Sequence, residues 1–174
     1  MAHPEQREFC ISVRNKFPSY FHNKSVLDVG SLDINGNNRY LFNDCSYIGN
    51  DIGSGKNVDL VIPIHKFYPF YLYDVVISTE MLEHDQYYFL SLKAMLRILK
   101  SPGLLIITAA TKGRPEHGTI NFKPEDSPYT NHYYRNITKK MLNDGLDFEK
   151  NFTEWKCIIN HKACDIYFWG IKLL

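Results

Sequence analysis

Apolar residues follow two patterns along the chain, helical spacing in some segments and short continuous runs in others. Near the N-terminus, Phe9, Val13 and Phe17 recur every four residues, which is the spacing of an amphipathic helix. Pro4 is suited to the first turn of a helix. We therefore expect an N-terminal helix to account for residues 1–23.

Five short apolar runs have the composition of buried strands, and they cover residues 25–30, 47–51, 58–62, 73–78 and 104–109. The run 73–78 is β-branched and nearly unbroken, as in a central parallel strand that is buried on both faces. After it, apolar residues at helical spacing predict a helix over 86–100, stopped by the turn residues 101–103. Only a short helix fits between the first two strands, over 35–42.

The C-terminal part is predicted to contain a helix over 138–142, capped by Gly145, and two aromatic-rich strands, 147–156 and 163–172. The order of elements predicts the α/β class: a Rossmann-like, open, mostly parallel seven-stranded sheet with helices on both faces and a C-terminal antiparallel strand pair. Because the chain has 174 residues and no internal repeat or linker, we expect a single domain over residues 1–174.

Composition and charge narrow the classes of protein. There are 20 Lys and Arg residues against 19 Asp and Glu residues, which gives a formal net charge of +1. This charge disfavours nucleic acid as a partner, and binding through a local basic groove is the alternative. The four cysteines form no C-x-x-C pair, so no metal is expected. The sequence lacks a leader-like segment and any apolar stretch near the roughly 18 residues that span a bilayer. We expect a soluble, cytoplasmic protein without a membrane partner.

Acidic residues surround a glycine loop at the end of the first strand. Asp28 and Gly30 close that strand, and Gly36 follows six residues after Gly30. The second and fourth strands also end in polar residues, namely Asp51 and the series Ser78, Thr79 and Glu80. In an open α/β sheet the ligand lies beyond these carboxyl ends. A dinucleotide loop has closer glycines, and carboxylates would repel its phosphates, whereas a sulfonium, an ammonium and an unphosphorylated ribose fit this acidity.

Three segments, in this order and spacing, resemble the class I S-adenosylmethionine-dependent methyltransferases, and within them the broad group that includes ubiquinone and menaquinone biosynthesis methyltransferases. They are Val26-Leu27-Asp28-Val29-Gly30-Ser31, Tyr47-Ile48-Gly49-Asn50-Asp51-Ile52, and the longer segment from Tyr73 to His84. The resemblance covers about residues 24–110. It implies the fold given above, methyl transfer as the activity and S-adenosyl-L-methionine as the cofactor.

The resemblance also implies roles for single residues. Asp28 and Gly30 would hold the methionine end of the cofactor, Asp51 the ribose hydroxyls, Ile52 one face of the adenine, and the carbonyl of Ser78 the amino group. The same motifs place Ser31, Thr79 and Glu80 at the cofactor. An acid at position 80 is equally suited to complement the dipole of the following helix.

The sequence departs from the family pattern at two positions. Leu32 stands where the family usually has a second glycine, and Pro63 stands where an acid often binds the adenine amine. We expect Asn35 and Gly36 to supply the close approach to the ligand through a longer loop. Ile64 and His65 are then expected to meet the adenine with a backbone amide and a ring.

The methyl acceptor is predicted to be a small molecule that bears a hydroxyl group, such as a sugar. The fourth motif reads Ser-Thr-Glu-Met rather than the Asn/Asp-Pro-Pro-Tyr that resembles enzymes methylating the amines of bases, and no Pro-Cys nucleophile is present. Transfer by direct displacement requires alignment of the acceptor and exclusion of water. The alternative function is a non-catalytic S-adenosylmethionine-binding partner subunit of a methyltransferase complex. No oligomeric state is predicted.

A hydroxyl acceptor needs a base, and His84 and His117 are the two candidates by their positions in the chain. A histidine packed at position 84 for structural reasons is the alternative. The segment 111–135 is too polar and too long for a simple connection, so we expect it to be an acceptor lid, with Lys112, Arg114 and His117 as donors. A solvated surface loop is the alternative for this segment.

Overall fold

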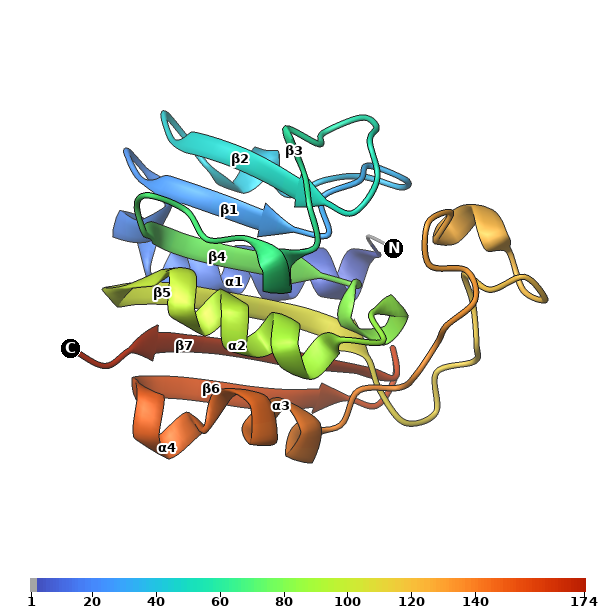
Figure 1. Cartoon of the computed structure of the whole chain (residues 1–174). Coiled ribbons are helices and arrows are strands. Elements are labelled where there is room, and N and C mark those ends of the chain that lie inside the picture. Colours follow the sequence, from blue (N-terminus) through green and yellow to red (C-terminus); the bar gives the residue numbers. More distant parts are fainter. Residues whose placement is uncertain (1–2) are drawn as a thin grey trace.

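Seven strands form one open sheet in the computed structural model, which describes residues 3–174 (Figure 1). The strands are β1 (Ser25–Val29), β2 (Ser46–Asp51), β3 (Leu60–Val61), β4 (Tyr73–Thr79), β5 (Leu99–Ala110), β6 (Phe152–Asn160) and β7 (Asp165–Lys172). Their order across the sheet is β3-β2-β1-β4-β5-β7-β6. The pairs from β3 to β5 are parallel, and β7 is antiparallel to both of its neighbours. The predicted Rossmann-like sheet is confirmed.

Helices cover both faces of the sheet, as predicted (Figure 1). Helix α1 (Pro4–Lys16) lies on one face, and α2 (Tyr88–Ile98), α3 (Lys139–Leu146) and α4 (Phe148–Asn151) lie on the other. Each face has its own apolar core. Val75 and Ile77 of β4 belong to the core beneath α1, whereas Val76 belongs to the core beneath α2. This alternation explains why the run 73–78 is apolar at nearly every position.

Helix α2 is shorter than the predicted helix over 86–100. It ends at Ile98, and β5 begins at once with Leu99, so that the residues 101–103 lie within the strand instead of stopping the helix. Leu99 pairs with Tyr73 of β4, and the register then shifts before Val75 pairs with Leu104. The strand therefore tolerates the proline and glycine at an irregularity near its start.

Gly145 does not cap a helix as predicted, because α3 continues to Leu146 and ends at Asp147, whose φ is 49°. Gly145 is instead buried against Leu92 of α2, where a Cβ atom would lie 2.9 Å from the Leu92 Cβ. The predicted strand 147–156 is half wrong, since α4 occupies its first residues and β6 begins at Phe152.

The short helix expected within 35–42 is a 3₁₀ helix, Arg39–Leu41. The third strand is shorter than the predicted 58–62, because β3 contains only Leu60 and Val61. Within residues 3–174, no helix is long and apolar enough to cross a membrane.

The parallel strands β1, β2, β4 and β5 all end at one edge of the sheet, and the loop 111–135 lies beyond this edge (Figure 1).

Candidate functional site

A cavity of about 660 Å³ lies beyond the carboxyl ends of β1, β2 and β4. This volume is in the range of small-molecule sites in proteins. With the exception of Ser78, every residue that the sequence suggested for cofactor binding lines it: Asp28, Gly30, Ser31, Asn35, Gly36, Asp51, Ile52, Ile64, His65, Thr79 and Glu80. The fold thus brings residues from five separate segments of the chain to one place.

Asp28 is the most deeply buried acid of the cavity, with a side chain that is almost fully shielded from solvent. The Tyr47 hydroxyl donates a hydrogen bond to its Oδ2 atom, and the Asn38 side-chain amide donates one to Oδ1 at 3.2 Å. Burial raises the pKa of Asp28 to about 6, against the lowering effect of these two donors. A cation in the cavity would favour the ionised carboxylate and lower this pKa again.

Asp51 and Glu80 extend the acidic lining. The backbone N–H groups of Leu32 and Gly53 each donate to the Asp51 carboxylate at 3.2 Å, while burial raises its pKa. Burial, together with the neighbouring charge of Glu83, raises the pKa of Glu80 to about 7. The ionised form of all three carboxyl groups at these adjoining strand ends is thus disfavoured by burial, so the cavity favours a cationic ligand over an anionic one.

The glycine loop follows an irregular path without a second glycine at position 32. Gly30 has a φ of 80°, and a Cβ atom there would overlap the Met81 side chain. The loop is tied to the chain after β2, because Ser31 Oγ donates to the Asn57 carbonyl at 3.1 Å and Asn57 Nδ2 donates back to the Ser31 carbonyl at 2.9 Å. Farther along, Gly36 N–H donates to Asp33 at 2.8 Å.

Ser78 lies apart from the other predicted residues. Its hydroxyl donates to the Val29 carbonyl at 2.9 Å, and the side chain is fully buried between β4 and β1. The residue joins the two strands whose ends carry Asp28 and Thr79, and it is not part of the cavity wall. The role expected for Ser78 involves its main-chain carbonyl, and that role stays a prediction.

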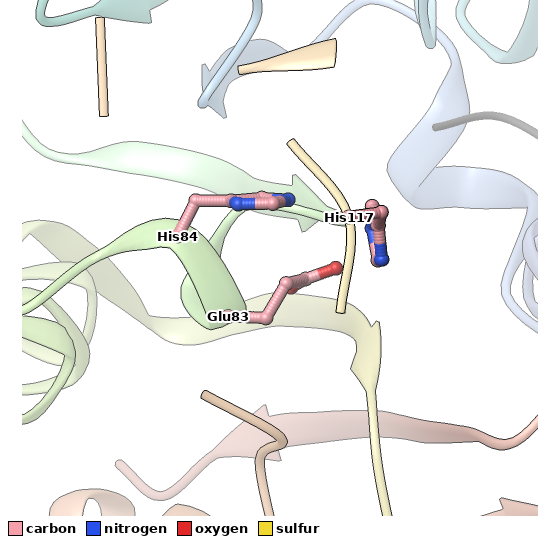
Figure 2. Close-up of side chains that lie close together, drawn as sticks. All are labelled: Glu83, His84 and His117. Carbon is pink, nitrogen blue, oxygen red and sulfur yellow. The ribbon is translucent and has the colours of Figure 1, made fainter. Parts of the chain in front are cut away.

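The two candidate bases lie side by side but in different positions relative to the cavity. Figure 2 shows the two rings close together. Their centroids are 5.1 Å apart, and of the two rings only that of His84 lines the cavity. Burial lowers the pKa of His84 to about 3 and also lowers the pKa of His117, so both rings are neutral at neutral pH. The Tyr134 ring packs edge-on against both.

The loop 111–135 reaches the cavity with its second half. Asp126, Tyr129 and His132 contribute to the wall. Of the three donors expected to orient an acceptor, Arg114 is turned away, since it donates to the Ala163 carbonyl at 2.6 Å and pairs with Asp165 at 3.2 Å.

Sequence reasoning missed several wall and supporting residues. Tyr47 was detectable in principle, because it pairs with Val26 across β1 and β2 and so shares a sheet face with Asp28, two residues on. Asn38, Gln6 and Tyr129 had no such signal. They come from an irregular loop, the first helix and the long loop, and local patterns do not predict where these segments meet the cavity.

No family model matches the sequence, and no curated protein matches it. Solved structures do match over nearly the whole chain. One is the 1,6-didemethyltoxoflavin-N1-methyltransferase of Burkholderia thailandensis with bound 1,6-didemethyltoxoflavin and S-adenosylhomocysteine. The two sequences are 14% identical and the TM-score is 0.67. The match covers 97% of this chain and 78% of that protein's chain.

Two further structures are similar to the same degree. The N-terminal domain of EvdMO1, in the presence of S-adenosylhomocysteine and D-fucose, is 16% identical with a TM-score of 0.67 and covers 99% of this chain and 84% of its own. The [4+2]-cyclase SpnF is 12% identical with a TM-score of 0.66 and covers 97% of this chain and 81% of its own. These likenesses show the fold: it is that of the class I S-adenosylmethionine-dependent methyltransferases.

Proposed function

We propose that the protein is a methyltransferase that moves the methyl group of S-adenosyl-L-methionine, by direct displacement, to a small molecule bearing a hydroxyl group, such as a sugar. The observation that supports this proposal is that three carboxyl groups, the buried Asp28 and Glu80 and the half-buried Asp51, meet in one cavity at the strand ends. S-adenosylmethionine is complementary to this acidic wall, because it carries a positively charged sulfonium and an ammonium group and has no phosphate.

The wall divides into regions that suit the parts of the cofactor. Asp28 and Gly30 lie at the end of β1, where the methionine portion would bind. Asp51 ends β2 and has acceptor capacity for the two ribose hydroxyls. Ile52, which is 44% exposed, and the buried Ile64 offer apolar contact for the adenine, with His65 beside them.

The remaining wall would receive the acceptor. His84 and His132 belong to the lining outside the residues assigned to the cofactor, and their rings offer aromatic surface and hydrogen-bonding atoms. Such a lining suits a polar small molecule better than a polymer. The loop 111–135 would act as the lid that excludes water from the sulfonium.

The similar structures support a small-molecule acceptor. One of them contains 1,6-didemethyltoxoflavin beside S-adenosylhomocysteine, and another was determined in the presence of S-adenosylhomocysteine and D-fucose. One of the similar structures is a [4+2]-cyclase, so this fold also supports an activity other than methyl transfer. Methyl transfer by this protein therefore has to be measured directly.

The decisive experiment is a transfer assay with S-adenosylmethionine that carries a labelled methyl group, offered with separate pools of metabolites, glycans, proteins and RNA. We expect label in the metabolite pool with the wild type and with Glu149→Gln, an exposed charge change on α4. Asp28→Asn, which keeps the shape of the buried acid and removes its charge, is expected to lose most of the transfer.

Two results would change the proposal. Label in the RNA or protein pool would show that the acceptor is a macromolecule and not a small molecule, while S-adenosylmethionine would remain the methyl donor. Tight binding of S-adenosylhomocysteine with no transfer to any pool would favour the non-catalytic partner subunit.

A further inference from the structure

Three side chains with metal-binding atoms converge beside the cavity. Glu83 and His84 lie in the 3₁₀ turn Leu82–His84 that follows β4, and His117 comes from the loop 111–135 on the opposite side (Figure 2). The Glu83 carboxylate and the His84 ring both point toward His117. One donor atom of each residue lies within 4.8 Å of a donor atom of both others.

One polar atom of each of these side chains is buried and has no hydrogen-bond partner among residues 3–174: Glu83 Oε2, His84 Nδ1 and His117 Nε2. An unpaired buried polar atom costs about 1–3 kcal/mol, and native structures rarely leave one without a reason. The side chains of Glu83 and His84 are at least nine-tenths buried, with 0% and 7% of the residue exposed. Three such atoms in one place indicate that something binds between them.

Two other polar atoms of the cluster are already held by the backbone. Glu83 Oε1 accepts a hydrogen bond from Ala110 N–H at 3.3 Å. His117 Nδ1 lies 3.1 Å from the Pro115 carbonyl, which assigns the ring proton to Nδ1 and leaves the lone pair on Nε2. A carbonyl that orients a histidine in this way is the usual support for a metal-binding ring.

We propose that Glu83, His84 and His117 bind a divalent transition-metal ion of the zinc class. A point equidistant from three atoms 4.8 Å apart lies about 2.8 Å from each, so movements of less than about 1 Å bring the donors to the roughly 2.0–2.1 Å of zinc coordination. Two imidazoles and one carboxylate suit Zn²⁺, Co²⁺ or Ni²⁺ better than Mg²⁺ or Ca²⁺, which prefer oxygen ligands throughout.

Three protein ligands leave the fourth position of a tetrahedral ion open for water or another oxygen ligand. Because His84 also lines the cavity, the ion would lie at the cavity wall. It would tie the loop 111–135 to the end of β4. A further consequence, which rests on the proposed function whereas metal binding itself does not, is that an acceptor hydroxyl bound to the ion would lose its proton more readily.

The test uses the full, untagged chain, freed of metal with a chelator and titrated with Co²⁺, whose visible absorption reports ligand number and type. We expect one equivalent to bind with the spectrum of a four- or five-coordinate nitrogen and oxygen site, and excess Zn²⁺ to abolish it. Glu83→Gln, which keeps the shape of the side chain, and His117→Ala should each weaken Co²⁺ binding at least about 10-fold. The control His161→Ala, on the exposed turn between β6 and β7, should bind like the wild type.

Thermal unfolding of each variant without metal verifies that it is folded. If the wild type gives no saturable visible band, or if Glu83→Gln and His117→Ala bind Co²⁺ as tightly as His161→Ala, the metal site does not exist. Calorimetry with S-adenosylhomocysteine on the same metal-free samples tests the cofactor cavity separately, so failure of one proposal is distinguishable from failure of the other.

Discussion

The hydroxyl of Tyr129 donates a 2.8 Å hydrogen bond to the carbonyl oxygen of Ser54, and this contact joins the loop 111–135 to the loop that follows β2. The Tyr129 ring lies against Gly53, where a Cβ atom would overlap it. Tyr129 lines the cavity, and Ser54 closely follows the lining residues Asp51 and Ile52, so the contact holds the loop beside the region where the adenine and ribose would bind.

Removing this contact should loosen the lid. In Tyr129→Phe, the loss of one hydrogen bond of about 0.5–1.5 kcal/mol should speed amide exchange in residues 120–132 by up to roughly 10-fold. Strand β5 should remain protected. Hydrogen exchange read by mass spectrometry measures both, with Tyr68→Phe, an exposed tyrosine outside the cavity, as the matched control. Equal exchange in the two variants would show that the hydrogen bond does not hold the loop.

The affinity for S-adenosylmethionine should depend on pH through Asp28. Its pKa is raised to about 6 by burial, and a cationic ligand requires the ionised form, so affinity should fall as the pH drops through about 6. Tyr47→Phe removes a donor to the carboxylate and should move this fall to higher pH. Calorimetry between pH 5 and 8 gives both curves. Parallel curves with the same midpoint would place the pH-sensitive group elsewhere.

Asp74 should make the fold sensitive to acid. Although partial burial raises its pKa, hydrogen bonds from Ser25 and the ion pair with Lys100 lower it to about 2, below the ordinary 3.8. A lowered pKa stabilises the folded state above pH 3.8, and this stabilisation is lost as the pH falls toward 2.

The variant Asp74→Asn isolates this effect. The wild type should lose about 1 kcal/mol more of its free energy of unfolding than Asp74→Asn between pH 5 and 2, a value reduced for solvent screening. Urea unfolding at each pH measures the difference, and Asp144→Asn on the exposed face of α3 serves as the control. If the wild type and Asp74→Asn lose the same free energy of unfolding over this pH range, Asp74 does not cause the sensitivity to acid.

Gly30 should not tolerate a side chain. Its φ of 80° is unfavourable for other residues, and a Cβ atom would overlap Met81. We expect Gly30→Ala to lower the free energy of unfolding by about 1–3 kcal/mol and to weaken cofactor binding as the loop shifts. Chemical unfolding measures the first effect and calorimetry the second. Wild-type stability in this variant would mean that the loop takes a different path.

The sequence predicted the sheet well because its signals are local. The apolar run of β4 and the acids near the ends of β1 and β2 are recognised from residues near each other in the chain, and parallel strands then bring Asp28 and Asp51 to one edge. The start of β5 at Leu99 was missed because it depends on pairing with Tyr73 across the sheet, which no helical pattern reveals.

The rest of the site depends on how distant segments meet. Glu83 and His117 are 34 positions apart, and nothing in their spacing indicates that the loop 111–135 returns to the end of β4. The loop is anchored there by a hydrogen bond from Arg135 N–H to the Glu83 carbonyl at 2.8 Å. Contacts of this kind follow from the path of an irregular loop, and sequence periodicity carries no information about that path.

The central claim is that the cavity at the strand ends binds the cofactor, and calorimetry with S-adenosylhomocysteine tests it most directly. The wild type and Glu149→Gln should bind with equal affinity, whereas Asp51→Ala should bind about 1.5–3 kcal/mol more weakly, which is roughly 10- to 150-fold, with its fold intact. Equal affinity in Asp51→Ala and the wild type, or no binding by the wild type, would contradict the account.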